Sequence, residues 1–202
     1  MSLRVCVFCS SGRKVDTMYY READAVGRLI GERGWRLVYG GTTTGPMMTL
    51  AAAAKEAGGS VTGIVPQCLV KQGLVNDDLD TLKFVLDMNT RKQAMLNLSD
   101  AFIALPGSIG TLEEMTAMIA MRTLGITDKP VILVNTNGHW DHLIALFEKM
   151  KEQGFTHDSF AEAYDVVEDA DAAIHWLEAW DTRKNKATVV EQENLVSNGE
   201  SA

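Results

Sequence analysis

The segment AFIALPGSIGTLEE, residues 101–114, carries the pattern that decides the fold of this chain. It begins with a solid apolar run, AFIA, which is typical of a strand buried on both faces of a sheet. The residues PGSIG then predict a tight turn, and TLEE opens a helix that we expect to end at Gly125. A strand that turns directly into a helix is one half of the unit from which parallel sheets are built.

The same succession of apolar runs and amphipathic segments is repeated along the chain. Strands are predicted at 3–8, 35–41, 60–66, 81–87, 101–107, 129–135 and 164–169. Helices are predicted at 18–33, 46–57, 90–100, 111–124, 140–153 and 170–180, while the polar stretch 67–80 has no clear pattern. This alternation predicts an α/β fold with a doubly wound, mostly parallel, Rossmann-like sheet and helices on both faces.

The length and the pattern together predict one domain followed by a tail. A chain of 202 residues can bury a sizeable core, and the strand and helix signals fill residues 1–180. Residues 181–202 are polar and unpatterned, so we expect a disordered C-terminal tail there.

Charge and composition exclude several classes of function. The formal net charge is −8 and no block of Lys or Arg occurs, which argues against a nucleic-acid partner. No apolar run reaches the roughly 18 residues that a membrane span needs, and the start MSLRVCVFCS does not resemble a secretion signal. We therefore expect a cytoplasmic protein that does not bind a membrane.

The cysteines and histidines give only weak signals. The residues CVFC match the C-x-x-C pattern of redox proteins, but Cys6 lies inside a predicted strand, where packing as a small apolar residue is the simpler explanation. His139 and His142 lie close together, but no third ligand is near in sequence, so we expect no metal site. The dinucleotide pattern G-x-G-x-x-G and the P-loop pattern are both absent, and no cofactor is predicted.

Two glycine-rich loops join predicted strands to predicted helices. They are GGTTTGPM at residues 40–47 and PGSIGT at residues 106–111. Each places unpaired backbone N–H groups at a helix N-terminus, where the helix dipole favours an anion such as phosphate. For a single loop, the alternative that the glycines merely allow a tight turn carries equal weight.

Glu114 and Arg91 have ordinary structural explanations as well as functional ones. The residues TLEE fit a capping box with Thr111 as N-cap and Glu114 at N3, and on structural grounds alone this explanation is favoured. Glu113 then lies about 100° further round the helix and faces elsewhere. Arg91 is by default a solvated arginine, and Asp87 is four residues away and could pair with it.

A family resemblance favours the functional explanations of Glu114 and Arg91. The residues DMNTRKQAM and PGSIGTLEE resemble the two linked signatures of the LONELY GUY (LOG) family, M-H-x-R-K-x-x-M and P-G-G-x-G-T-x-x-E. VCVFCSSG, LVYGGTTTGPM and LGITDKPVILVNTNGHWDHL are also similar to segments of that family, so the likeness covers roughly residues 3–180. Members are phosphoribohydrolases of cytokinin or purine nucleoside monophosphates, and many are mislabelled as lysine decarboxylases.

The resemblance implies a set of site residues. The family's catalytic arginine falls on Arg91 and its catalytic glutamate on Glu114, while Lys92 falls beside the arginine in the substrate-contacting pair. The predicted substrate-binding residues are Lys92, Gly107, Ser108, Ile109, Gly110, Thr111, Glu113, Ser10, Ser11 and Gly41. The resemblance also implies a homodimer.

The chain also departs from the family pattern. Ser108 stands at the second motif glycine, and Asn89 replaces the usual histidine. Further departures are Thr42, Pro46, Thr49 and Ala117, the last at a position where the family commonly has another glutamate.

Two functions remain open at this point. The first is hydrolysis of the N-glycosidic bond of a nucleoside 5′-monophosphate to a free base and ribose 5-phosphate. The alternative is a nucleotide-binding module of the same fold, a sensor or carrier, that binds without turnover. Both place the phosphate at the PGSIGT loop.

Overall fold

The computed structural model describes residues 2–199 and the side chains of residues 2–185. Its centre is a single sheet in which every pair of neighbouring strands is parallel. The strand order is β4-β3-β2-β1-β5-β6-β7. The strands are β1 (Arg4–Phe8), β2 (Arg36–Tyr39), β3 (Ser60–Pro66), β4 (Thr81–Val85), β5 (Ala101–Ala104), β6 (Val131–Val134) and β7 (Asp165–Val167). The predicted doubly wound α/β fold is confirmed.

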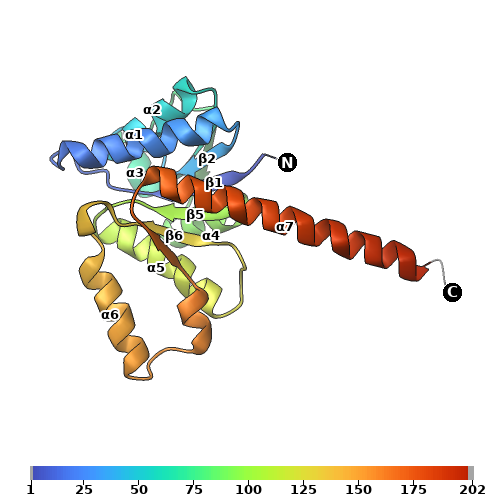
Figure 1. Ribbon diagram of the computed structural model, residues 1–202. Coiled ribbons are helices and arrows are strands. Elements are labelled where there is room, and N and C mark those ends of the chain that lie inside the picture. Colours follow the sequence, from blue (N-terminus) through green and yellow to red (C-terminus); the bar gives the residue numbers. More distant parts are fainter. Residues whose placement is uncertain (1, 200–202) are drawn as a thin grey trace.

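Helices cover both faces of this sheet (Figure 1). The helices α1 (Thr17–Glu32), α2 (Gly45–Glu56) and α7 (Ala170–Gly199) pack on one face, and α4 (Met88–Leu98), α5 (Ile109–Thr123) and α6 (Asp141–Glu152) pack on the other. A short helix, α3 (Gln67–Val70), lies in the stretch that the sequence left unassigned. Two 3₁₀ turns, η1 (Thr136–Gly138) and η2 (Asp158–Glu162), precede and follow α6.

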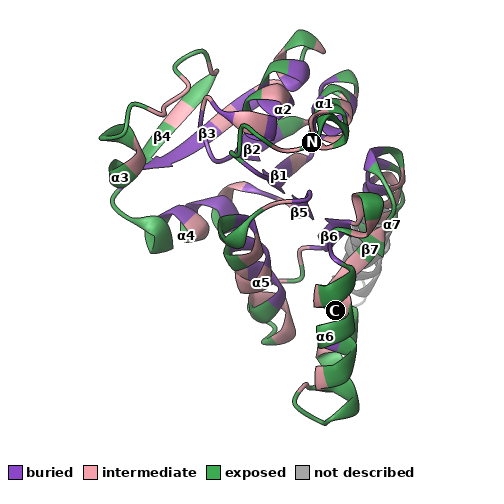
Figure 2. Ribbon diagram, turned by 90° about the vertical axis from the view of Figure 1, so that its left-hand side faces the viewer, coloured by how far each residue is buried: buried purple, intermediate pink, exposed green. Residues whose placement is uncertain are grey.

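The alternation of side chains along each strand divides the core into two layers. In β1, Val5 and Val7 belong to the layer beneath α1, α2 and α7, whereas Cys6 and Phe8 belong to the layer beneath α4, α5 and α6. Phe8 stacks on Phe102 of the neighbouring strand with 6.0 Å between ring centroids. The central strands are therefore buried on both sides, which explains their solid apolar sequences (Figure 2).

The strand order creates a crevice at one edge of the sheet. From β1 the chain proceeds outward to β4, and from β5 it proceeds outward to β7 in the opposite direction. The loops that follow β1 and β5 therefore diverge at the carboxyl ends of these adjacent strands. Both glycine loops of the sequence and the start of α4 lie at this same edge.

Small residues allow α1 and α2 to pack unusually closely. A Cβ atom at Gly27 would lie 2.2 Å from the carbonyl oxygen of Leu50, and one at Gly31 would lie 2.5 Å from that of Ala54. No side chain could be accommodated at either glycine unless the backbone moved. The contact fixes α2 against α1, and with it the loop that leads from β2 into α2.

The C-terminal helix continues past the predicted domain boundary. α7 runs through Asp181, and the ammonium group of Lys184 lies 4.9 Å from the ring centroid of Trp180. Residues 200–202 lie outside the described residues. That residues 181–202 form a disordered tail stays a prediction. Within residues 2–199, no helix combines the length and apolar character required to cross a membrane.

The close packing of α1 on α2 predicts the cost of a single methyl group. Gly27→Ala should lower the free energy of unfolding by about 1–3 kcal/mol, because the added Cβ forces the two helices apart. Chemical denaturation measures this change. Asp24→Ala, at an exposed position on the same helix, is the matched control and should change stability by less than about 0.5 kcal/mol. Equal stabilities of the two variants would contradict the packing argument.

Candidate active site

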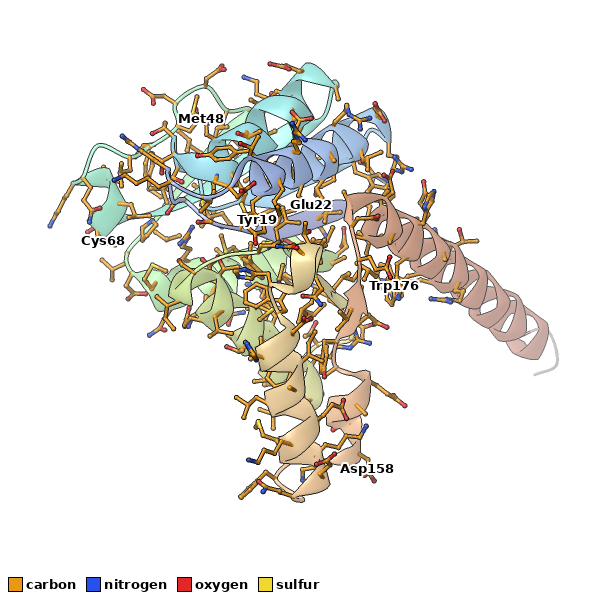
Figure 3. All side chains as sticks on the ribbon, turned by 60° about the vertical axis from the view of Figure 1, so that its left-hand side comes forward. Tyr19, Glu22, Met48, Cys68, Asp158 and Trp176 are labelled. Carbon is orange, nitrogen blue, oxygen red and sulfur yellow. The ribbon has the colours of Figure 1, made fainter. Side chains whose placement is uncertain are left out.

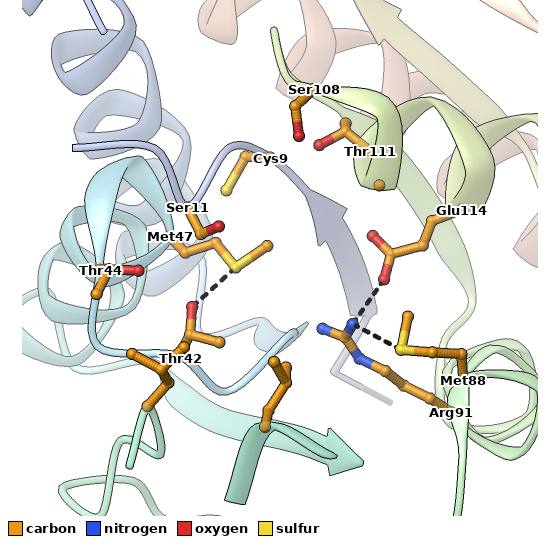
Figure 4. Close-up of a pocket in the computed structure, with 13 residues that line it drawn as sticks. Cys9, Ser11, Thr42, Thr44, Met47, Met88, Arg91, Ser108, Thr111 and Glu114 are labelled. Atoms are coloured by element: carbon orange, nitrogen blue, oxygen red, sulfur yellow. Dashed lines mark hydrogen bonds and ion pairs between the residues drawn. The ribbon is translucent and has the colours of Figure 1, made fainter. Parts of the chain in front are cut away.

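A cleft opens at the carboxyl ends of the strands, where the β1 and β5 loops diverge (Figure 4). Its empty volume is about 550 Å³, including the part open to solvent. It is bordered by segments that are distant in sequence and are brought together only by the fold. The lining residues are Cys9, Ser11, Thr42, Thr44, Met47, Leu69, Leu74, Met88, Arg91, Ser108, Gly110, Thr111 and Glu114.

Arg91 enters this cleft from α4 and is only 4% exposed. Its Nε donates a hydrogen bond of 3.1 Å to the carbonyl oxygen of Ile64. Gly40 makes room for it, because a Cβ there would lie 2.2 Å from Arg91 Nη2. The expectation of a solvated arginine is therefore wrong, since the end of β3 and the glycine after β2 form a buried site for the guanidinium group.

Asp87 has a different role from the expected pairing with Arg91. It is the N-cap of α4, and its Oδ1 accepts hydrogen bonds from the backbone N–H and the hydroxyl of Thr90 at 2.8 and 2.9 Å. These contacts lower the pKa of Asp87, because the backbone and hydroxyl donors of Thr90 stabilise its ionised form. Asp87 thus fixes the start of the helix that carries Arg91.

Glu114 is not a member of a capping box. α5 begins at Ile109 with Ser108 as N-cap, which places Thr111 inside the first turn and Glu114 six residues after the cap. Glu114 is 3% exposed, and its Oε1 lies 3.0 Å from Nη1 of Arg91. The capping prediction was wrong because the GSIG segment, which looks like a loop in sequence, already forms the N-cap and the first residues of the helix.

The environment of Glu114 opposes its ionisation. Burial is the largest influence and raises the pKa of the carboxyl group, while the guanidinium group of Arg91 acts in the opposite direction. Glu113 raises this pKa further and Lys92 lowers it. Among the described residues, no donor is aligned with Glu114 Oε1 as a hydrogen bond, although Arg91 Nη1 lies 3.0 Å away.

The start of the helix that carries Glu114 has the features of an anion site. Ser108, Gly110 and Thr111 line the cleft at the N-terminus of α5. The first N–H groups of a helix lack intrahelical partners and carry the positive end of its dipole. Thr111 is buried, and its hydroxyl group adds a further donor beside these amides. An anion bound there would lie about one helical turn from Glu114.

The comparison with known proteins identifies the family. The model of the family described as "Possible lysine decarboxylase" matches residues 47–177. A protein of Arabidopsis thaliana named cytokinin riboside 5′-monophosphate phosphoribohydrolase is 38% identical over 177 residues, which cover 88% of this chain and 78% of that protein. The chain belongs to the LOG family.

A second relative agrees with this assignment, and two solved structures share the fold. A probable cytokinin riboside 5′-monophosphate phosphoribohydrolase of Oryza sativa subsp. japonica is 41% identical over 152 residues, 75% of this chain and 68% of that protein. The molybdenum cofactor binding protein of Rippkaea orientalis has a TM-score of 0.67 at 23% identity, covering 89% of this chain and 97% of that chain. The molybdenum cofactor carrier protein of Chlamydomonas reinhardtii has a TM-score of 0.66 at 21% identity, and the match covers 89% of this chain and 98% of that chain. At these identities the two structures bear on the fold alone.

The cleft brings together about half of the residues that the LOG signatures predict. Arg91 and Glu114 contact each other, and four other predicted residues line the same cleft: Ser11, Ser108, Gly110 and Thr111. They come from the loop after β1, from α4 and from the start of α5.

Six predicted residues lie outside the lining of this cleft. Lys92 and Glu113 form an ion pair with each other, and Ile109 is 78% exposed. Gly41 has a φ of +72° and its backbone approaches Val65 too closely for a side chain. Ser10 and Gly107 border a smaller neighbouring cavity of about 360 Å³.

The cleft has an apolar wall, formed by Met47, Leu69, Leu74 and Met88, that was not predicted from the sequence. Met47 and Met88 belong to the LOG-like motifs, but nothing in the sequence showed that their side chains line the cleft. Leu69 and Leu74 lie in the unassigned stretch. This stretch is held against the β2–α2 loop by a 3.1 Å hydrogen bond from Thr43 N–H to the carbonyl oxygen of Leu74. Such non-local pairing leaves no periodic signal in the sequence.

The two cysteines of the CVFC pattern do not form a redox pair in the structure. Cys6 and Cys9 are both buried and free, and burial raises the pKa of both thiols. A buried thiol with a raised pKa is a poor source of the thiolate that redox chemistry requires. Cys6 belongs to the core layer beneath α4, α5 and α6, so its interpretation as an apolar packing residue is confirmed.

The environments of Glu114 and Asp87 predict opposite titration behaviour. The Glu114 carboxyl group should titrate above its ordinary value of 4.5, because burial disfavours its charge, and Asp87 should titrate below 3.8. Carbon-13 NMR of the side-chain carboxyl groups during an acid titration measures both. Lys92→Met should shift the Glu114 midpoint to still higher pH, because a cation that lowers it is removed. A Glu114 midpoint at or below 4.5 would contradict this electrostatic description.

Proposed function

We propose that this protein hydrolyses the N-glycosidic bond of a nucleoside 5′-monophosphate, with a purine or cytokinin base, to give the free base and ribose 5-phosphate. The observation that carries the proposal is the buried Arg91–Glu114 pair, which lies in the same cleft as the N-terminus of α5. The names of LOG relatives at about 40% identity support the same reaction.

The phosphate group is assigned to the amides at the start of α5. A dianion there gains hydrogen bonds from unpaired N–H groups and a favourable interaction with the helix dipole. Anchoring this group fixes the position of the attached ribose, so that the anomeric carbon need not find its orientation by diffusion. Binding energy from a non-reacting part of the substrate thereby contributes to the rate.

Glu114 is assigned to the ribose. Cleavage of the bond between C1′ and the base nitrogen develops positive charge on the sugar, and a carboxylate beside that carbon stabilises it. The same carboxylate can orient a water molecule whose oxygen bonds to C1′, while the proton released goes to the departing base. Within the described part of the chain, Glu114 is the one carboxylate that lines this cleft, so a scheme with two carboxylates is not invoked.

Arg91 and the apolar wall are assigned to the rest of the substrate. The guanidinium group favours the ionised form of Glu114 and so opposes the effect of burial on its pKa, and it can also stabilise the electron density that the leaving base gains. Met47, Leu69, Leu74 and Met88 offer an apolar surface on which a flat base can pack.

The alternative function, nucleotide binding without turnover, uses the same anion site. Binding without turnover gives no role to Glu114, although burying this carboxylate costs free energy. The hydrolase function gives it a role and is therefore favoured. Incubation with AMP and related monophosphates, followed by chromatography for free base, separates the two functions. Tight binding without base release from any monophosphate would favour the binding module.

Replacement of Glu114 tests its assigned role. Glu114→Gln should reduce the rate of base release about a hundredfold or more, because the charge that stabilises the sugar cation is lost. Affinity for the monophosphate, measured by calorimetry, should be retained, since the amides at the start of α5 are unchanged.

Glu114→Gln is expected to lower the stability of the protein as well as the rate of base release. Breaking a buried pair leaves Arg91 uncompensated and can cost about 3–5 kcal/mol, so rates are compared at a temperature where thermal unfolding shows the variant to be folded. Glu152→Gln, an exposed change on α6, is the control and should keep the unmodified rate. A wild-type rate in Glu114→Gln would exclude the mechanism.

A further inference from the structure

His139 lies in the connection between β6 and α6 and reaches across to the anion loop. Its Nε2 is 3.2 Å from the backbone nitrogen of Gly107 and 3.0 Å from the carbonyl oxygen of the same residue. A single ring nitrogen can accept from the N–H or donate to the carbonyl oxygen, depending on the tautomer. In either state His139 holds the peptide of Gly107 through a hydrogen bond between elements 32 residues apart.

The imidazole ring is held in place by two aromatic neighbours. Tyr19 of α1 meets its edge with 5.8 Å between ring centroids, and Trp140 packs perpendicular to it at 4.6 Å. Trp140 is buried, and its backbone N–H donates a 2.7 Å hydrogen bond to Oδ1 of Asn135. Figure 3 labels Tyr19 on α1, above the start of α6. His139 is thus held by the two rings and by the Gly107 backbone, although the residue is exposed to solvent.

The other side of Gly107 is closed by Thr111. A Cβ atom at Gly107 would lie 2.1 Å from the hydroxyl oxygen of Thr111, so the loop and the first turn of α5 are in direct contact there. Gly107 is therefore fixed between Thr111, which lines the main cleft, and His139, which borders the smaller cavity. Ser108, the N-cap of α5, lines both cavities.

We infer that His139 is a positioning residue for phosphate binding. By holding the Gly107 peptide, it fixes the direction in which the chain enters α5, and hence the direction of the amides at residues 108–111. The inference rests on the proposed function, because it assumes that the phosphate binds at these amides. His139 touches neither the phosphate nor the sugar and acts only through the loop.

The alternative role of a metal ligand lacks support within the described part of the chain. No group of three histidine, cysteine or carboxylate side chains there is placed to hold an ion. The Nε2 atom, one of the two ring nitrogens that can bind a metal, is already directed at the Gly107 peptide.

Two substitutions separate the hydrogen bond from the ring packing. His139→Phe keeps an aromatic ring against Tyr19 and Trp140 but removes the nitrogen. His139→Gln keeps a group that can donate or accept but removes the ring. His142→Phe, at an exposed position three residues further along the chain, is the matched control for adding a phenyl group.

The expected result is a selective loss of phosphate affinity. His139→Phe should raise the KM for AMP about fivefold to tenfold and leave kcat within about twofold, because a hydrogen bond that aligns the loop is lost while the chemical groups remain. The inhibition constant of inorganic phosphate should rise in parallel. His139→Gln should restore much of the affinity, and His142→Phe should match the unmodified protein.

Other outcomes would overturn the inference. One is an unchanged KM for AMP in His139→Phe, and another is a fall in kcat with no change in KM. A third is a loss of AMP affinity in His139→Gln as large as that in His139→Phe, which would show that only the packing of the ring matters. Calorimetry with AMP and inorganic phosphate tests the same ranking of affinities even if the protein releases no base. In that case the proposed reaction fails while the positioning role of His139 is still measured.

Discussion

The ion pair between Arg91 and Glu114 is the interaction on which the rest of the site depends. Two charges taken out of water lose several kcal/mol of solvation each, and a single contact at 3.0 Å offsets this only when the surroundings are favourable. The structure supplies such surroundings through the carbonyl oxygen of Ile64, which accepts from Arg91, and through the missing side chain of Gly40. The pair therefore constrains four elements at once, because α4, α5, the end of β3 and the loop after β2 must all keep their positions.

The parallel sheet explains how one chain satisfies these constraints. Because the strand order reverses direction between β1 and β5, the loops after these strands leave space for a ligand. α5 starts directly after β5 and directs its N-terminus and Glu114 into that space, while the capped start of α4 directs Arg91 from the side of β3. The anion site and the carboxylate lie on one helix about one turn apart, which suits a ligand with a phosphate joined to a sugar.

The sequence predicted the fold well because its signals are local. Solid apolar runs such as AFIA and the glycine turn after them identify the strands, the helices and the parallel arrangement. Residue roles were less predictable. The motif resemblance singled out Arg91 and Glu114, yet local rules suggested a solvated arginine and a capping box, because neither rule includes burial by distant segments. The apolar wall from Leu69 and Leu74 and the contact of His139 with Gly107 depend on non-local pairing, which a single sequence does not reveal.

The central claim is that the phosphate and the sugar of a nucleotide bind to the two parts of one helix. A crystal structure of the Glu114→Gln variant with AMP tests it most directly, because the slow variant should retain the intact ligand. We expect phosphate oxygens within hydrogen-bond distance of the amides of residues 108–111, C1′ beside the side chain at position 114 and the base against Met47 and Met88. A phosphate bound elsewhere, or a ribose whose C1′ points away from position 114, would contradict it.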